Sequence, residues 1–167
     1  MQLQLGRLNE SVILMTDYYH ITLIENLDSI LANGLRANSE MQIFVCTSLE
    51  LLPKIAGQQV FINEYSVFKI DPKGIEATPT HDDVAETGNE FQFIINQPLI
   101  KPEYIEHVKD ERWHRFDLAE YNHRLSFKHI GVDEKEVVKH LEEVVSHNKE
   151  WCEYYNNKHG KNIRPQA

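Results

Sequence analysis

The fold is decided by the sequence YYHITLIENLDSILANGL, residues 18–35. Aromatic and β-branched residues fill most of Tyr18–Leu23, which predicts a β-strand. Apolar residues then recur at helical spacing between Asn26, a good N-cap residue, and Gly34, which stands where a left-handed residue would end a helix. His20 is therefore expected on a strand that leads into a short helix. A strand holds a ligand-binding histidine rigidly, but on its own His20 is more simply explained as a structural residue.

Composition and charge define the class of protein. The 167 residues are 41% hydrophobic and 26% charged, which predicts one globular domain with a sizeable core. The net charge of −9 falls entirely within residues 1–108, which hold 6 Lys and Arg against 15 Asp and Glu, while residues 109–167 hold 11 of each. Phosphate-rich polymers are bound mainly through Lys and Arg, so the acidic part of the chain argues against broad nucleic-acid binding.

The sequence carries no signal for a membrane, for export or for a metal. Residues 1–5 have neither a basic start nor a long apolar centre, and every apolar run is too short to cross a bilayer. We therefore expect a cytoplasmic protein without a membrane partner. Cys46 and Cys152 are far apart and match no metal-ligand spacing, so we expect two free thiols and no metal.

Two later stretches are also predicted strands. The first is MQIFVCTS, residues 41–48, where Ser48 could equally cap a helix that begins at Leu49. The second is EFQFII, residues 90–95, with Glu90 at its first position, directly after a polar acidic loop at residues 80–89. A glutamate at the start of a strand is commonly no more than an exposed edge charge.

Together these stretches resemble a known family. Tyr19-His20-x-Thr22, followed by the helix and Gly34-Leu35, is similar to the opening of the ADP-ribosyltransferase fold. It is most similar to the branch whose first motif residue is histidine, which includes poly-ADP-ribose polymerases and diphtheria-like toxins. DarT-type DNA modifiers and tRNA 2′-phosphotransferases share a similar opening. Cys46-Thr47-Ser48 resembles the family's Ser-Thr-Ser motif, and Glu90 stands where the family places its catalytic glutamate.

The resemblance implies an architecture. We expect an α+β protein with an ADP-ribosyltransferase-like split β-sandwich, in which two small, mostly antiparallel sheets form an NAD cleft. The recognisable core covers about residues 17–108, and residues 109–167 are expected to form a C-terminal helical extension of a single domain, residues 1–167.

The resemblance also implies a mono-ADP-ribosyltransferase that uses NAD+ as co-substrate. In this interpretation Glu90 and His20 are catalytic. The NAD-binding residues are expected to be His20, Ile21, Thr22, Thr47, Ser48 and Tyr65, with Phe61 as an alternative to Tyr65 for stacking on nicotinamide. Two alternatives stay open: a non-enzymatic module that binds NAD, ADP-ribose or a protein, and an NAD glycohydrolase.

The resemblance leaves the acceptor unidentified among proteins, nucleic acids and small molecules. Arginine-modifying members carry Gln or Glu two residues before the catalytic glutamate, where this chain has Gly88, which argues against arginine as the target. The tRNA 2′-phosphotransferases hold phosphates with several arginines, whereas residues 1–108 contain only Arg7 and Arg36. A compact, acidic enzyme of this kind would suit a microbial toxin or a viral counter-defence factor.

The remainder of the chain is predicted to be helical. Aromatic and basic residues alternate through residues 112–129, which indicates either an element with inward-facing aromatics or an acceptor-binding surface. One helix is predicted from Asp133 to Gly160, with an apolar stripe that forms core or, if too wide for one domain to cover, a homodimer surface.

Overall fold

The computed structural model describes residues 16–59, 63–82, 91–128 and 130–166. The chain forms two compact units. The sheet unit comprises Met1–Leu52 and Glu64–Arg112, and the helical unit comprises Pro53–Asn63 and Trp113–Ala167. Residues 109–112, expected at the start of the helical extension, belong to the sheet unit and form the end of its last strand.

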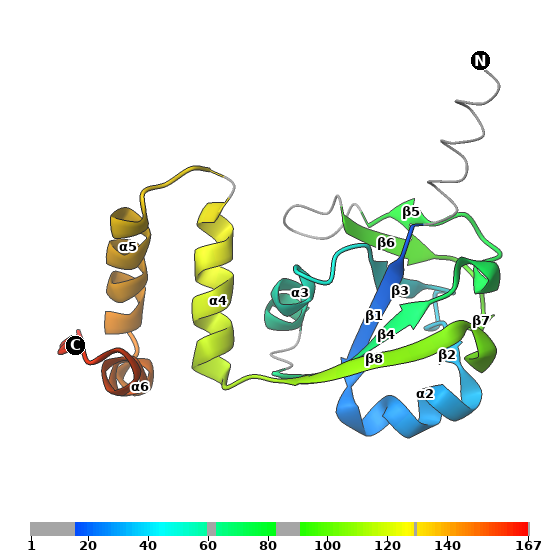
Figure 1. The fold of residues 1–167 in the computed structure, drawn as a ribbon, viewed down its shortest axis with the longest axis horizontal. Helices are drawn as coiled ribbons and strands as arrows, with labels where there is room; N and C mark the ends of the chain where they lie inside the picture. Colours follow the sequence, from blue (N-terminus) through cyan, green and yellow to red (C-terminus); the bar gives the residue numbers. More distant parts are fainter. Residues whose placement is uncertain (1–15, 60–62, 83–90, 129, 167) are drawn as a thin grey trace, which may run out of the picture. The chain divides into compact units, whose positions relative to one another are not determined.

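The sheet unit is built on a six-stranded antiparallel sheet with the order β5-β6-β3-β1-β4-β8 (Figure 1). Its strands are β1 (Tyr18–Leu23), β3 (Ile43–Cys46), β4 (Glu64–Ile70), β5 (Thr80–His81), β6 (Gln92–Ile95) and β8 (Ile105–Arg112). A second sheet pairs only β2 (Leu35–Arg36) with β7 (Leu99–Ile100). The α+β class is thus confirmed, and the two sheets are unequal in size.

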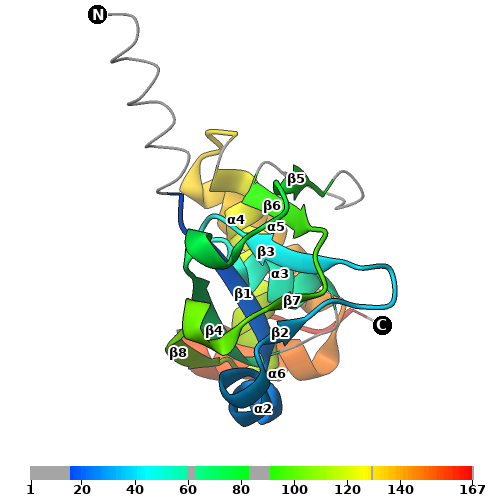
Figure 2. The same cartoon turned by 90° about the vertical axis from the view of Figure 1, so that its right-hand side faces the viewer.

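Short helical segments connect the strands. β1 leads through the 3-10 turn η1 (Ile24–Asn26) into α2 (Leu27–Asn33), which lies at one end of the sheet in both views (Figures 1 and 2). Two further 3-10 turns, η2 (Pro72–Gly74) and η4 (Pro102–Tyr104), follow β4 and β7. The predicted helix cap is wrong in one respect. The Asn26 side chain makes no cap hydrogen bond; instead its Nδ2 donates to Thr22 Oγ1 at 3.0 Å.

Gly34 ends α2 because the backbone must pass close to β7. Its φ is +85° with an extended ψ of −176°, so the residue has positive φ without being left-handed helical. A Cβ at this position would lie 2.2 Å from the carbonyl oxygen of Ile100. The Gly34 amide donates to the Ile30 carbonyl oxygen, which closes the helix.

The core of the sheet unit lies between the large sheet, α2 and the small sheet. Strand alternation directs Val45, Phe68 and Ile95 to one face. There they meet Ile30 of α2 and Ile100 of β7. Burial of apolar side chains on this face therefore fixes where β1 and its neighbours lie.

The loop predicted over residues 80–89 is partly wrong. Thr80 and His81 form β5, which pairs with β6 at Ile94 and Phe93. The His81 ring stacks on Phe93 at a centroid distance of 4.5 Å, which explains how so polar a segment holds an edge strand. Residues 83–89 lie outside the described residues.

The helical unit contains most of α3 (Leu52–Gln59) together with α4 (Arg115–Lys128), α5 (Glu134–Ser146) and α6 (Lys149–His159). The single helix predicted from Asp133 to Gly160 is wrong, because it is two helices. The Asn148 side chain accepts a hydrogen bond from the Trp151 amide at 3.1 Å and so caps α6 instead of continuing the stripe. α6 ends at Gly160 as predicted, and Gly160 has a left-handed conformation.

The apolar stripe packs inside the helical unit. Leu141 and Val145 of α5 meet Cys152 and Tyr155 of α6 in one buried cluster. For these residues the core interpretation is confirmed, while the predicted homodimer surface stays a prediction. Within the described ranges, no helix combines the length and apolar character needed to cross a membrane.

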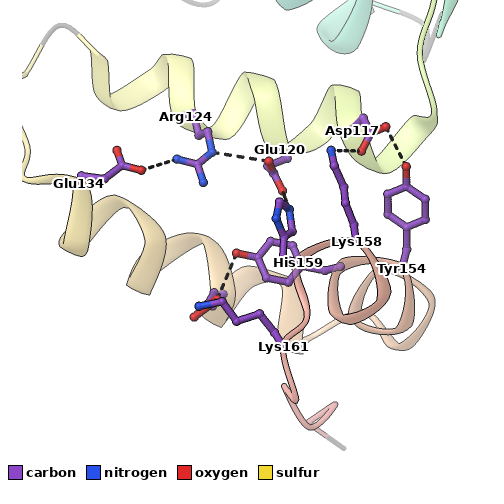
Figure 3. Close-up of polar contacts among 10 residues, drawn as sticks. Asp117, Glu120, Arg124, Glu134, Tyr154, Lys158, His159 and Lys161 are labelled. Carbon is purple, nitrogen blue, oxygen red and sulfur yellow. Dashed lines mark hydrogen bonds and ion pairs between the residues drawn. The ribbon is translucent and has the colours of Figure 1, made fainter.

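Ion pairs hold α4 against α6 (Figure 3). Asp117 accepts hydrogen bonds from Lys158 Nζ at 2.7 Å and from the Tyr154 hydroxyl at 2.8 Å. Although burial opposes the shift, the bonds from Lys158 and Tyr154 leave the pKa of Asp117 below its ordinary value.

Two arginines of residues 112–129 are engaged in ion pairs. Arg124 pairs with Glu120 of α4 and with Glu134 of α5, and Arg115 pairs with Glu150 of α6. The basic residues that made residues 112–129 a predicted acceptor-binding surface are therefore partly neutralised by contacts between the helices.

Candidate functional site

β1 pairs very differently with its two neighbours. It pairs with β4 at six positions, from Tyr18↔Ile70 to Leu23↔Tyr65. It pairs with β3 at one position, Tyr19↔Cys46. We call the unpaired region beyond this pair the split; it comprises His20–Leu23 of β1 and Ile43–Val45 of β3.

β3 pairs more extensively with β6 than with β1. β3 and β6 pair at four positions, from Ile43↔Ile95 to Cys46↔Gln92. The loop before β3 is tied to the same side, since Asn96 Nδ2 donates to the Met41 carbonyl oxygen at 3.2 Å. Met41 itself has a φ of +62°, a conformation that is uncommon outside glycine.

His20 bridges the split. Its Nδ1 lies 2.7 Å from the carbonyl oxygen of Phe44. A carbonyl oxygen only accepts, so Nδ1 carries the proton and donates. In the neutral imidazole Nε2 then holds a lone pair and can accept a hydrogen bond from a ligand hydroxyl.

The surroundings of His20 favour this neutral form. Burial lowers the pKa of the His20 imidazole below its ordinary value, and the bond to the Phe44 carbonyl offsets part of that shift. His20 is therefore neutral near pH 7, with its ring orientation fixed from β3.

Thr47 joins β3 to the start of β6. Its amide donates to the Phe91 carbonyl oxygen at 2.9 Å, and its hydroxyl lies 3.4 Å from the same oxygen. Phe91 directly follows Glu90 in the sequence. Glu90 lies outside the described residues, so its predicted catalytic role stays a prediction.

Cys46 organises the turn that contains Ser48. Its Sγ donates to the Ser48 carbonyl oxygen at 3.1 Å and accepts from the Ser48 amide at 3.3 Å. Burial raises the pKa of the Cys46 thiol to about 11, although the bond to the Ser48 backbone opposes the shift, so the sulfur stays protonated at neutral pH. Ser48 does not cap the next helix, which begins at Leu52.

The remaining predicted NAD-binding residues fall into two groups. Ile21 and Thr22 are half-buried on β1 at the split. Tyr65 belongs to the core, with 1% of its surface exposed, so its ring presents no face to a ligand. Phe61 lies outside the described residues.

Phe44 is a residue beside the split that the sequence analysis did not single out; its backbone carbonyl oxygen accepts the hydrogen bond from His20. Its side chain is 41% exposed and belongs to β3, on the flank of the split opposite Ile21. The signal was present in the sequence, because Phe44 alternates with Ile43 and Val45, both of which are buried. An aromatic residue on the outward phase of a buried strand is a candidate for stacking on a ligand.

No metal centre accompanies the split in the part of the chain that the structure describes. No group of three or more His, Cys, Asp and Glu side chains there could hold an ion. Asp82, which follows His81 after β5, is buried, and its backbone amide donates to the Gln92 carbonyl oxygen at 3.0 Å.

Comparison with protein-family models and with curated proteins found no match to this chain. The family resemblance therefore rests on the residues of the three motif stretches.

Proposed function

We propose that the protein is a mono-ADP-ribosyltransferase with a split β-sandwich, which cleaves the nicotinamide–ribose bond of NAD+ and transfers ADP-ribose to an acceptor macromolecule. One observation carries the proposal. The stretches around His20, Thr47 and Glu90 are far apart in the sequence, yet they belong to or directly adjoin three adjacent strands, in the order β6-β3-β1. The family resemblance assigns these same stretches to one NAD site.

His20 would bind ribose. Its Nδ1 is committed to Phe44, and its neutral Nε2 accepts a hydrogen bond from a ribose hydroxyl. The His20 ring belongs to β1 and is hydrogen-bonded to β3, so Nε2 is held in place before NAD+ binds. This preorganisation lowers the entropic cost of ordering the ribose.

Glu90 would stabilise the transition state. Cleavage sends the electron pair of the C1′–N bond into the pyridinium ring and releases neutral nicotinamide, which leaves positive charge on an oxocarbenium-like ribose. A fixed carboxylate stabilises that charge, most strongly where water is excluded. The acceptor nucleophile then bonds to C1′, and Glu90 takes its proton before passing it to solvent.

The split provides groups for the nicotinamide ring. In the resembling family, backbone groups next to the first motif residue hold the carboxamide, a position that Ile21 occupies here. The predicted stacking residue Tyr65 is buried, whereas Phe44 has an exposed side chain that projects from the sheet face opposite to His20.

The decisive test is release of nicotinamide from NAD+ with and without a cell extract as the source of acceptor. The proposal expects release that increases with extract, together with transfer of label from adenine-labelled NAD+ to a macromolecule. Release that extract leaves unchanged would favour the glycohydrolase alternative. A folded protein that releases no nicotinamide under either condition would contradict the proposal and favour a binding module.

A further inference from the structure

A cavity of about 230 Å³ opens beside the first residue of β1. It is lined by Tyr18, Pro72 and residues 75–79, which belong to the segment between β4 and β5. Clefts that enclose a whole drug-sized ligand have volumes of roughly 300–1,000 Å³. This cavity is smaller and therefore suits one base of a dinucleotide.

The cavity lies on the sheet face to which His20 points. Tyr18 and His20 are two residues apart on β1, so their side chains project from one face, about 7 Å apart along the strand. Ile75 and Ala77 pack against the core cluster that contains Phe68, the β4 partner of His20. A dinucleotide whose ribose contacts His20 can therefore reach the cavity with one of its bases.

The lining of the cavity combines half-buried apolar residues with an exposed polar rim. Ile75, Ala77 and Pro79 are half-buried. Glu76 and Thr78, which alternate with them, are exposed. Apolar walls favour an uncharged planar group, and the Glu76 carboxylate repels the phosphates of a dinucleotide. The cavity thus suits a base and excludes the pyrophosphate.

The Tyr18 ring is positioned by Phe93 of β6. The two rings meet edge to face, with centroids 5.9 Å apart at an interplanar angle of 85°. Tyr18 is half-buried, and burial raises the pKa of its hydroxyl, so the ring is uncharged at neutral pH. An uncharged aromatic ring that lines a cavity is suited to contact with a planar base.

One buried side chain fixes the segment that lines the cavity. Gln97 is 4% exposed, and its Oε1 accepts hydrogen bonds from the Glu76 and Ala77 amides at 2.8 and 3.3 Å. Its Nε2 donates to the carbonyl oxygens of Gly74 and Leu99, both at 2.9 Å. The lining is therefore held to β7 before a ligand binds, which lowers the entropic cost of binding.

We infer that this cavity binds the adenine base of NAD+, with the Tyr18 ring against the base. The inference rests on the proposed function, which supplies the dinucleotide and places a ribose at His20. Adenine is favoured over nicotinamide because the mainly apolar lining suits a neutral base better than a pyridinium cation. The proposed function also places the carboxamide beside Ile21, which follows His20 on β1, whereas Tyr18 precedes it.

The kinetic test compares NAD+ with nicotinamide mononucleotide, which has the same scissile bond and lacks adenine. We measure kcat/KM for nicotinamide release from both by the parent, by Tyr18→Leu and by Tyr19→Leu. The preference of the parent for NAD+ should fall by roughly 3- to 10-fold in Tyr18→Leu, as expected for one lost aromatic contact. Tyr19 projects from the opposite face of β1, so Tyr19→Leu should retain the preference. Effects on the nicotinamide half, which both substrates share, cancel in this ratio.

Binding of ADP-ribose tests the same inference without turnover, because ADP-ribose keeps adenine and lacks nicotinamide. Calorimetry should give a Kd about 3- to 10-fold higher for Tyr18→Leu than for the parent. In the parent, ADP-ribose should slow hydrogen exchange in residues 72–79, a measurement that needs no variant. Parental affinity in Tyr18→Leu, or binding without protection of this segment, would show that adenine binds elsewhere.

The two proposals fail in distinguishable ways. If the parent cleaves NAD+ and Tyr18→Leu retains the full preference for NAD+ over the mononucleotide, the inference is wrong and the proposed function stands. If ADP-ribose protects residues 72–79 but the parent cleaves no NAD+, the transferase is contradicted and the cavity belongs to a binding module. If the parent neither binds ADP-ribose nor cleaves NAD+, both proposals are wrong.

Discussion

The Nδ1 of His20 donates across the split to the carbonyl oxygen of Phe44 at 2.7 Å. This bond connects β1 to β3 beyond the one position where their backbones pair. One nitrogen of the ring thus serves the fold, and the other remains for a ligand. The two roles can be separated by substitution.

His20→Asn and His20→Gln should divide these roles. The Asn amide nitrogen reaches roughly the position of Nδ1, so this variant should keep the bridge and lose the ligand acceptor. We expect near-parental stability and a KM for NAD+ raised about 5- to 10-fold, as for one lost hydrogen bond. His20→Gln extends toward Nε2 and should lose about 1 kcal/mol of stability instead. Equal effects of both variants on unfolding and on NAD+ kinetics would contradict the division.

Cys46 should be replaceable by serine but not by alanine. A serine hydroxyl can donate to the Ser48 carbonyl and accept from the Ser48 amide, as the thiol does. Cys46→Ser should therefore stay within about 1 kcal/mol of the parent in urea unfolding, whereas Cys46→Ala should lose about 1–2 kcal/mol more. Equal stability of the two variants would show that the sulfur contacts do not hold the turn.

Gly34 and Gly131 offer a matched pair for backbone strain. Both have positive φ, but a Cβ at Gly34 would meet the Ile100 carbonyl oxygen at 2.2 Å, while a Cβ at Gly131 would meet nothing within 4 Å. Gly131→Ala should cost about 1 kcal/mol, the conformational penalty alone. Gly34→Ala should cost roughly 2 kcal/mol or more, because the backbone of β7 must move. Similar unfolding free energies for the two variants would mean that the contact between a Cβ at position 34 and the Ile100 carbonyl oxygen costs no additional stability.

Tyr155 should make the helical unit sensitive to alkali. Burial, followed by the charge of Glu142 and the hydrogen bond to it, raises the pKa of Tyr155 to about 12. The folded-state pKa then exceeds the unfolded value near 10, so the contribution of Tyr155 is complete below about pH 10 and is lost as pH rises toward about 12. At pH 11 the loss amounts to about 1 kcal/mol.

Helical circular dichroism during urea unfolding at pH 9 and pH 11 measures this loss. Tyr155→Phe lacks the titrating group and should lose less stability between the two pH values than the parent. The other tyrosines are common to both proteins, so their titration cancels in the difference. An equal loss in both proteins would contradict the assignment.

Local patterns allowed β1, α2 and the end of α6 at Gly160 to be predicted, because strand composition, apolar spacing and capping residues act over a few positions. The break between α5 and α6 was missed because Trp151 and Tyr155 keep the helical phase of the residues before Asn148. The capping preference of Asn148 was the available signal.

The split could not be predicted from local patterns. It concerns the pairing of strands that are distant in the sequence, β1 with β3 and β3 with β6. Tyr65 was assigned to nicotinamide as an aromatic residue in the right region, but the pairing of β4 between β1 and β8 places it in the core. Phe44 of β3 is the aromatic residue with an exposed side chain beside the split.

The most direct test of the NAD+ cleavage mechanism is the rate of nicotinamide release from NAD+ by the parent, by Glu90→Gln and by Glu106→Gln. The last variant removes the same charge from an exposed position on β8 and serves as the matched control. Glu90→Gln keeps the size of the side chain and loses the charge that faces the oxocarbenium, so its rate should fall by about 10²–10³-fold while Glu106→Gln matches the parent. Nicotinamide release by Glu90→Gln at the parental rate would contradict the catalytic assignment.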